Sequence, residues 1–306
     1  MARWTADDIP DQTGRTFIVT GANSGLGLET TRAVAGRGAR VIMAVRNLDK
    51  GRQALDELRA EQPQAALDLR HLDLSDLDSV RSFAETVIAD GTPVDVLVNN
   101  AGIMMCPRTL TKQGFEQQFG TNHLGHFALT GLLLGTLKGG PGPRVVTVSS
   151  MLHKGGSMNF DDLAGERSYS PNAAYRQSKL ANVLFAVELD RRLRATGSPV
   201  RSLLAHPGYS ATNLQSTGPT GLNRLAMRLG NRFAAQDARM GALPQLYAAT
   251  NPDAVSGQFI GPDGYIEFKG YPTVVQPAEA AKNPMTAQRL WTLSEELTGI
   301  HFDLPA

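Results

Sequence analysis

The sequence contains a single cysteine, Cys106. One cysteine excludes an internal disulfide framework and a cysteine-based metal cluster, and it fits a reducing compartment. An excess of charge is also absent, because 30 basic residues stand against 29 acidic ones and leave a net charge of +1. Nucleic acids and anionic membranes are therefore not predicted as partners, since both are usually bound by a strongly basic surface.

Long hydrophobic runs are missing as well. The longest uncharged stretch of interest, between Glu116 and Lys138, contains glutamine, asparagine, histidine and several glycines, which makes it too polar to span a membrane. Residues 1–15 lack the apolar core that a secretory signal needs. We therefore expect a cytoplasmic protein without a membrane span.

Apolar residues are plentiful, at 42% of 306 positions, which is enough for a large core. Short β-branched or apolar runs alternate with stretches of helical spacing. The predicted strands are 16–20, 40–45, 66–72, 94–99, 144–150, 200–206 and 257–261, and the helices between them are 25–36, 49–62, 76–89, 112–137 and 174–196. This alternation predicts one α/β domain over residues 1–306, with a Rossmann-type doubly wound parallel sheet of about seven strands flanked by helices.

Two segments fall outside the alternation. Residues 213–239 are rich in glycine, arginine and polar side chains, and we expect them to leave the sheet and to shape a substrate pocket. Residues 284–299 have helical spacing and end in a glycine, which predicts a C-terminal helix. No stretch has the composition of a linker, so no second domain is predicted.

The first predicted strand runs directly into a glycine-rich turn, T-G-A-N-S-G-L-G, at residues 20–27. A strand, such a turn and a helix N-terminus form an anion site, because free backbone N–H groups and the helix dipole hold a phosphate. The spacing differs from the G-x-G-x-x-G dinucleotide fingerprint, so the turn alone is a weak signal. The residues predicted to bind a cofactor here are Gly21, Asn23, Ser24, Gly25, Leu26 and Gly27.

The end of the second predicted strand selects the dinucleotide. It reads A-V-R-N at residues 44–47, and no acidic residue follows until Asp49. An acidic side chain at this place binds the ribose 2′-hydroxyl of NAD, whereas an arginine accommodates the 2′-phosphate of NADP. The alternative is that Arg46 ends the strand in solvent. The sequence favours NADP(H) over NAD(H).

Tyr175 and Lys179 lie on one face of a predicted helix, because residues four apart are neighbours there. An ammonium beside a phenol favours the phenolate, so Lys179 is expected to lower the pKa of Tyr175 and to make it a proton donor and acceptor. Tyr265 and Lys269 have the same spacing in a segment closed by glycines, which is predicted to be extended. Four residues of a strand span about 13 Å, so helical context selects Tyr175.

Further motifs follow in order along residues 14–261. They are N-N-A-G at 99–102, Asn122, Ser150, Y-x-x-x-K at 175–179 and P-G-x-x-x-T at 207–212. With the glycine-rich turn, this ordered set resembles the short-chain dehydrogenase/reductase family. Within it, the chain is similar to the retinol dehydrogenase and WW-domain-containing oxidoreductase subgroup through G-A-N-S-G-L-G at 21–27, Arg46, T-N-H-L-G-H-F at 121–127, S-K-L-A-N-V-L-F at 178–185 and H-P-G at 206–208.

The resemblance implies a catalytic set of four residues. Tyr175 would exchange a proton with the substrate oxygen, and Lys179 would lower the pKa of Tyr175 and bind the nicotinamide ribose. Ser150 would donate a hydrogen bond to the substrate oxygen, and Asn122 would hold a water that links Lys179 to solvent. Ser149 offers a second hydroxyl, but strand alternation lets only one of the two serines face the site.

The resemblance also implies cofactor contacts beyond the glycine-rich turn. They are assigned to Arg46, Asp73, Leu74, Asn100, Ala101, Gly102, Tyr175, Lys179, Pro207, Gly208, Tyr209 and Thr212. Structural alternatives exist, because Asp73 could cap the helix that starts near Asp76, and Asn99 and Asn100 could simply form a turn. No metal is expected: His123 and His126 lack an acidic partner at ligand spacing and are interpreted as structural.

The segment 151–174, between Ser150 and Tyr175, is longer than in most of the family and resembles the subgroup's extra loop. Together with 104–108 and 213–239, it is predicted to shape the pocket. We expect NADP(H)-dependent interconversion of an alcohol and a lipophilic ketone or aldehyde. The alternatives are an NADP(H)-binding sensor without turnover, and C=C reduction or sugar-nucleotide epimerisation on a related scaffold. The resemblance further suggests a homodimer or homotetramer, formed through the helices at 112–137 and 174–196.

Overall fold

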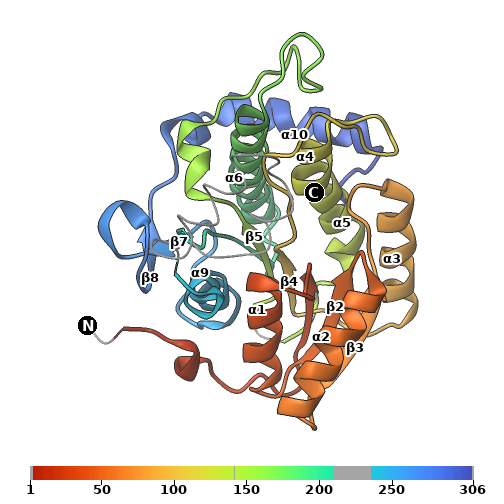
Figure 1. Ribbon diagram of the computed structural model, residues 1–306, viewed down its shortest axis with the longest axis vertical. Coiled ribbons are helices and arrows are strands. Elements are labelled where there is room, and N and C mark those ends of the chain that lie inside the picture. The colour runs from red at the N-terminus through yellow and green to blue at the C-terminus, as the bar shows by residue number, and fades with distance from the viewer. Residues whose placement is uncertain (1–2, 141, 210–235, 305–306) are drawn as a thin grey trace.

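The computed structural model describes residues 3–140, 142–209 and 236–304. Its centre is an eight-stranded sheet in the order β3-β2-β1-β4-β5-β6-β7-β8 (Figure 1). The strands are β1 Thr16–Thr20, β2 Arg40–Val45, β3 Ala66–His71, β4 Val96–Asn99, β5 Arg144–Val148, β6 Arg201–Ala205, β7 Phe259–Pro262 and β8 Pro272–Val275. Strands β1 to β7 pair in parallel, which confirms the predicted doubly wound parallel sheet.

The eighth strand was not predicted from the sequence. It pairs antiparallel with β7 at the edge of the sheet. Its four residues begin with Pro272, and most of its side chains are not buried. A short, half-exposed strand that starts with proline is typical of a sheet edge, where the missing N–H costs no ladder hydrogen bond, and it carries little sequence signal.

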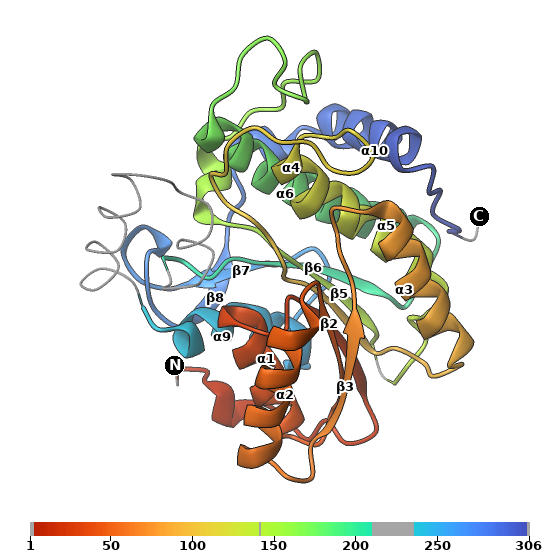
Figure 2. The same cartoon turned by 45° about the vertical axis from the view of Figure 1, so that its right-hand side comes forward.

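Helices cover both faces of the sheet (Figure 2). Helices α1 (Gly25–Ala35), α2 (Leu48–Glu61) and α9 (Ala238–Thr250) lie on one face, and α3 (Leu77–Ala89), α5 (Gly125–Leu133) and α6 (Pro171–Ala195) lie on the other. Strand residues alternate between the two apolar cores. Phe17 and Val19 of β1 pack into the first core, whereas Ile18 packs into the second, because successive strand side chains point to opposite faces.

The single helix predicted over residues 112–137 is divided in the structure. It consists of α4 (Gln117–Phe119), a π turn η2 (Gly120–Leu124), α5 and a 3₁₀ turn η3 (Leu134–Thr136). A π turn adds one residue to a helical turn and is often found at functional sites. Here it contains Asn122, one of the predicted catalytic residues.

The remaining short elements are 3₁₀ turns. They are η1 Ala6–Asp8, η4 Met151–Gly155, η5 Tyr265–Glu267 and η6 Glu279–Lys282. Among the described residues, no helix is both long and apolar enough to cross a membrane.

The predicted C-terminal helix is confirmed as α10 (Pro284–Thr298). Pro284 occupies its first turn, and Gly299 follows it in a left-handed conformation with φ of 65°, which are the favoured places for these residues at the two helix ends. Helix α10 lies on α6 (Figure 1). Its Trp291 is buried against the rings of Phe127 and Phe185. The chain's own C-terminal helix thereby packs on α6 and reaches Phe127 of α5.

Candidate active site

A cleft of about 1110 Å³ runs along the carboxyl ends of the parallel strands, where ligands of open α/β sheets bind. Most residues predicted for the site line it, namely Gly21, Asn23, Ser24, Gly25, Leu26, Arg46, Asp73, Leu74, Asn100, Ala101, Gly102, Ser150, Tyr175, Lys179, Pro207, Gly208 and Tyr209. Two of the predicted residues, Gly27 and Asn122, do not line the cleft. Thr212 and residues 213–235 fall outside the described part of the chain.

The glycine-rich turn opens one end of the cleft. Gly21 has φ of 68°, a conformation that favours glycine. A Cβ on Gly27 would lie 2.3 Å from the Gly21 carbonyl oxygen and 2.6 Å from Asn100 Nδ2, so this glycine permits close packing rather than a ligand contact. Ser24 makes no side-chain capping bond to α1. The first N–H groups of α1 are therefore free to hold a phosphate.

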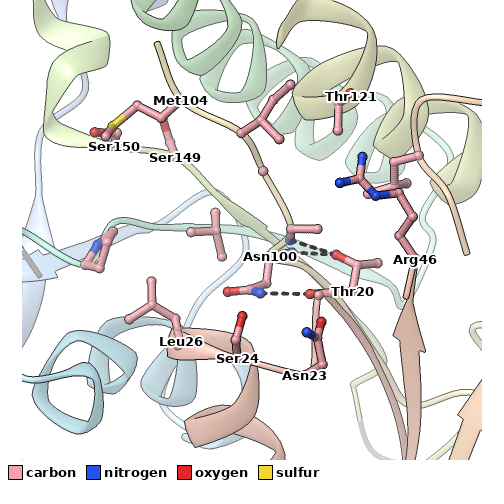
Figure 3. A pocket seen from close by; sticks show the side chains of 18 of the residues that line it. Thr20, Asn23, Ser24, Leu26, Arg46, Asn100, Met104, Thr121, Ser149 and Ser150 are labelled. Atoms are coloured by element: carbon pink, nitrogen blue, oxygen red, sulfur yellow. Dashed lines mark hydrogen bonds between the residues drawn. The ribbon is translucent and has the colours of Figure 1, made fainter. Parts of the chain in front are cut away.

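Thr20 joins this turn to the loop after β4. Its hydroxyl accepts hydrogen bonds from the N–H groups of Asn100 and Ala101, both at 2.9 Å, and its carbonyl accepts one from Asn100 Nδ2 at 2.8 Å (Figure 3). These bonds tie the ends of β1 and β4 together, so the two central strands present the glycine-rich turn and the N-N-A-G loop as one rigid edge of the cleft.

His126 extends this network to Asn122. His126 Nδ1 lies 3.0 Å from the Asn122 carbonyl oxygen, and Nε2 lies 2.9 Å from the Thr20 hydroxyl. A carbonyl only accepts, so Nδ1 carries the hydrogen and Nε2 accepts from Thr20. Burial lowers the pKa of His126 to about 4, which keeps the ring neutral. The ring thus has a structural role between the π turn and β1.

Arg46 directly follows β2 and lines the far end of the cleft beside Asn47 and Lys50. Its side chain is exposed. Within the described residues, no carboxylate forms an ion pair with its guanidinium. The group is therefore free to bind an anionic ligand in the cleft.

Asp73 does not cap the helix that follows it. Its Oδ1 accepts hydrogen bonds from the N–H and the hydroxyl of Ser75, at 2.9 and 2.7 Å. Helix α3 is capped by Asp76 instead, whose Oδ1 accepts from Asp78 N. Asp73 forms a local turn and lines the cleft.

Tyr175 and Lys179 enter the cleft from α6. Both side chains are buried, and Lys179 Nζ donates to the Val148 carbonyl at 3.3 Å. Burial lowers the pKa of Lys179 to about 8. Burial also raises the pKa of Tyr175 to about 12, although the nearby Ser150 hydroxyl lowers it. The expected lowering of the Tyr175 pKa is therefore wrong for this structure, because desolvation of the phenolate outweighs the favourable interactions.

The two adjacent serines have different partners. Ser149 Oγ donates to the Lys179 carbonyl at 2.8 Å and so holds α6 to the end of β5. Ser150 Oγ accepts from Leu152 N at 3.2 Å and lies near enough to the Tyr175 phenol to lower its pKa against the larger effect of burial. Ser150 is thus the serine whose hydroxyl lies beside the predicted proton donor.

Asn122 fastens the loop after β4 to α6. Its Oδ1 accepts from Ile103 N at 2.8 Å, and its Nδ2 donates to the Ile103 carbonyl and to Ser178 Oγ, both at 2.9 Å. A Cβ on Gly102 would lie 3.5 Å from Lys179 Nζ, so the loop passes close to the lysine. The Asn122 side chain holds the two segments together. Its main-chain carbonyl accepts from His126 Nδ1, so the predicted water would have to share that oxygen with His126.

The extra segment 151–174 contacts the loop 104–108. The Tyr169 hydroxyl lies 3.0 Å from both the Cys106 carbonyl and Glu116 Oε1. Half-buried beside Glu116, the phenol of Tyr169 has a raised pKa. Four apolar residues of these two segments line the cleft, namely Met104, Met105, Met151 and Leu152. The two segments therefore form one apolar wall.

Some lining residues were missed from the sequence, among them Lys50, Thr121 and Phe268. Lys50 lies four residues after Arg46, in the first turn of α2, and Thr121 directly precedes Asn122, so both are close in sequence to a residue that was predicted. Phe268 gave no such signal, because only the folded chain brings it to Tyr209, where the two rings stack 4.9 Å apart.

Comparisons with known proteins identify the class. The family model described as short chain dehydrogenase matches residues 15–221, and the chain belongs to the short-chain dehydrogenase/reductase family. Human retinol dehydrogenase 13 is 42% identical over 293 residues, which cover 94% of this chain and 85% of that protein. Human retinol dehydrogenase 12 is 43% identical over 292 residues, 95% of this chain and 88% of that protein. The chain is thus an oxidoreductase of the retinol dehydrogenase-like subgroup.

Solved structures show the same fold. A crystal structure of an uncharacterized protein from Mycobacterium paratuberculosis is 48% identical with a TM-score of 0.83, and the match covers 99% of this chain and 100% of that one. A candidate NAD(P)-dependent gluconate 5-dehydrogenase from Beutenbergia cavernae, solved with bound NADP at low occupancy, is 26% identical with a TM-score of 0.63, over 82% of this chain and 96% of that one.

Proposed function

We propose that this protein is a cytoplasmic, NADP(H)-dependent oxidoreductase that interconverts an alcohol and a lipophilic ketone or aldehyde. The observation that carries the proposal is the meeting of Ser150, Tyr175 and Lys179 in a cleft whose other end holds Arg46. That arrangement combines a hydrogen-bond donor, a proton donor and a cationic phosphate contact along one continuous surface.

The residues present fit a dinucleotide with a 2′-phosphate. The uncapped N-terminus of α1 suits the pyrophosphate, and the exposed Arg46, with Lys50 beside it, suits the 2′-phosphate. The relative from Beutenbergia cavernae with bound NADP supports a nicotinamide cofactor. When bound, NADPH supplies the hydride.

The chain's own residues handle the oxygen of the substrate and its proton. Ser150 and Tyr175 donate hydrogen bonds to the carbonyl oxygen, and Tyr175 transfers its proton there as negative charge develops. A pKa of about 12 keeps the phenol protonated at neutral pH, which suits reduction. Lys179, with a pKa of about 8, can return a proton to the Tyr175 phenolate, and a water held by Asn122 would link Lys179 to solvent.

The shape of the cleft suggests a lipophilic substrate. Met104, Met105, Met151 and Leu152 supply an apolar and adaptable wall. The names of the human relatives, retinol dehydrogenases 12 and 13, support an alcohol or aldehyde of this kind. Retinol itself is one candidate within that class.

Assembly through α5 and α6 is not supported by the contacts of these helices. Trp291 of α10 packs on Phe127 of α5 and Phe185 of α6, with ring centres 5.2 and 5.9 Å apart. Phe302 packs on Phe127 at 4.9 Å. A partner would have to displace these side chains. We therefore propose that two copies of the protein do not associate through α5 and α6.

One experiment separates the proposed function from its alternatives. NADPH oxidation is followed with a panel of aldehydes, ketones and activated alkenes, beside direct titration of NADPH. The proposal requires turnover of at least one carbonyl compound. Binding without turnover would favour a sensor, and turnover of alkenes alone would favour C=C reduction.

A further inference from the structure

The turn between β7 and β8 has an unfavourable backbone conformation. Residues 265–269 were expected to be extended, but Tyr265–Glu267 form the 3₁₀ turn η5. Ile266 and Glu267 have φ of 49° and 60°. This left-handed region disfavours residues with a Cβ, and β-branched isoleucine above all. Such conformations cluster at ligand clamps and persist only where the surroundings hold them.

Glu267 supplies the side chain that holds this turn. Its Oε2 lies 2.9 Å from His206 Nε2, and its Oε1 lies 2.5 Å from Lys154 Nζ. Gly208 N donates to His206 Nδ1 at 3.2 Å, so the ring hydrogen is on Nε2 and is donated to Glu267. The hydrogen bond from His206 lowers the pKa of Glu267 to about 2. The carboxylate is therefore ionised and bonded on both oxygens.

The turn forms part of the wall at the Tyr209 end of the cleft. Phe268, the residue after Glu267, accepts a hydrogen bond from Tyr209 N at 2.8 Å, and their rings stack with planes 11° apart. Both side chains line the cleft. A Cβ on Gly208 would lie 2.5 Å from the Phe268 carbonyl oxygen, so the two segments are in direct contact.

The second carboxylate oxygen of Glu267, Oε1, contacts the segment after Ser150 through Lys154. Lys154 belongs to η4 (Met151–Gly155), which begins directly after that serine. In the same turn, His153 Nδ1 lies 2.6 Å from the Ser150 carbonyl oxygen. Glu267 therefore connects two strand ends, the one after β5 that carries Ser150 and the one after β6 that carries Tyr209.

We infer that Glu267 is a positioning residue, which sets the distance between the Ser150 segment and the Pro207–Tyr209 segment so that the nicotinamide half of the cofactor fits between them. This inference rests on the proposed function. It predicts that loss of the Glu267 carboxylate weakens binding of the nicotinamide half and not of the adenosine half, because in the described part of the chain Arg46 and the glycine-rich turn form no hydrogen bond or ion pair with the turn at 265–268.

The test compares two ligands that share the adenosine 2′-phosphate half. Dissociation constants for NADPH and for 2′,5′-ADP are measured on wild type, Glu267→Gln, Glu267→Ala and the matched control Glu279→Gln. Glu279 is an exposed glutamate in η6 that pairs with Lys282 and does not line the cleft. We expect Glu267→Ala to weaken NADPH binding about 10-fold, Glu267→Gln to weaken it less, and 2′,5′-ADP to bind all four proteins within about two-fold.

Retained 2′,5′-ADP binding shows that each variant is folded. Wild-type NADPH affinity in both Glu267 variants would overturn the inference, and so would equal weakening of both ligands, since that indicates a general effect on the fold. If wild type binds neither ligand, the proposed function fails instead. Hydrogen–deuterium exchange of peptides covering 201–209 then decides without a cofactor: the inference requires faster exchange in Glu267→Gln than in Glu279→Gln.

Discussion

Lys179 Nζ lies 5.9 Å from the centre of the Tyr175 ring, and its ammonium donates to a main-chain carbonyl rather than to the phenol. The pair predicted from their spacing is thus brought onto one side of the cleft without a direct hydrogen bond. Burial dominates both groups, since it raises the pKa of Tyr175 and lowers that of Lys179. The two pKa values therefore move apart, to about 12 and about 8, so a proton passes downhill from the Lys179 ammonium to the Tyr175 phenolate.

Replacing the Tyr175 phenol tests whether the site catalyses carbonyl reduction. Tyr175→Phe removes one hydroxyl and nearly preserves the ring volume, so folding and NADPH affinity are expected to change little. Without a positioned proton donor, carbonyl reduction should slow by about 10²–10⁴-fold. Tyr265→Phe is the matched control, because the Tyr265 side chain is exposed and lies outside the cleft. Steady-state kinetics and NADPH titration check both variants, and an unchanged rate in Tyr175→Phe would exclude it as the donor.

The pKa of Lys179 predicts the pH profile of reduction. The ammonium is present below its pKa of about 8 and is lost above it, so kcat/KM for reduction should be flat at lower pH and fall roughly 10-fold per pH unit above the inflection. Lys179→Met should reduce the rate and remove this inflection. A wild-type profile that stays flat to pH 10 would contradict the role of Lys179.

His126 predicts a loss of stability in acid. Its pKa is about 4 when folded and about 6.5 when unfolded, so between these values the unfolded chain binds more protons and stability falls as pH falls. The loss from this residue is complete below pH 4 and amounts to roughly 3 kcal/mol. Urea unfolding at pH 7.5 and 5 measures the part of this loss that develops by pH 5, roughly 2 kcal/mol. His126→Asn, which cannot titrate, should show a smaller difference between the two pH values.

The covered helix face predicts the assembly state. Cross-linking should give no dimer joined through α5 or α6, and Trp291→Ala should lower the free energy of unfolding by about 3–5 kcal/mol, because it leaves a cavity in the cluster of Phe127, Phe185 and Phe302. A dimer that cross-links between two copies of α6 would contradict this expectation.

Elements of the fold could be predicted from the sequence where the local residue pattern agrees with the final structure. Buried β-branched runs predicted the seven parallel strands, and a proline and a glycine at its two ends located α10. Strand alternation left the choice between Ser149 and Ser150 open; the structure shows their different hydrogen bonds, while the catalytic role of Ser150 stays a prediction.

The sequence was insufficient where long-range packing decides. The π turn at Asn122 and the left-handed Ile266 and Glu267 depend on contacts with distant segments, and no local pattern encodes them. The pKa of Tyr175 depends on how deeply α6 is buried, which i, i+4 spacing does not reveal. The positions that local reasoning missed therefore lie mostly at the site.

Arg46→Asp tests the assignment of the cofactor. We expect wild type to bind NADPH more tightly than NADH, because the exposed guanidinium of Arg46 at the end of β2 can form a charge-assisted bond with the 2′-phosphate. Losing that bond should cost about 1.5–3 kcal/mol, roughly ten- to a hundred-fold in affinity. The new carboxylate would also repel the phosphate and accept a hydrogen bond from a ribose hydroxyl, so the preference should reverse to NADH. Arg52→Asp is the matched control, since Arg52 pairs with Asp49 on the exposed side of α2 and does not line the cleft. Fluorescence titration of NADPH and NADH on wild type and both variants measures the affinities. Equal wild-type affinity for NADPH and NADH would defeat the NADP assignment and leave the proton-transfer roles of Tyr175 and Lys179 untouched.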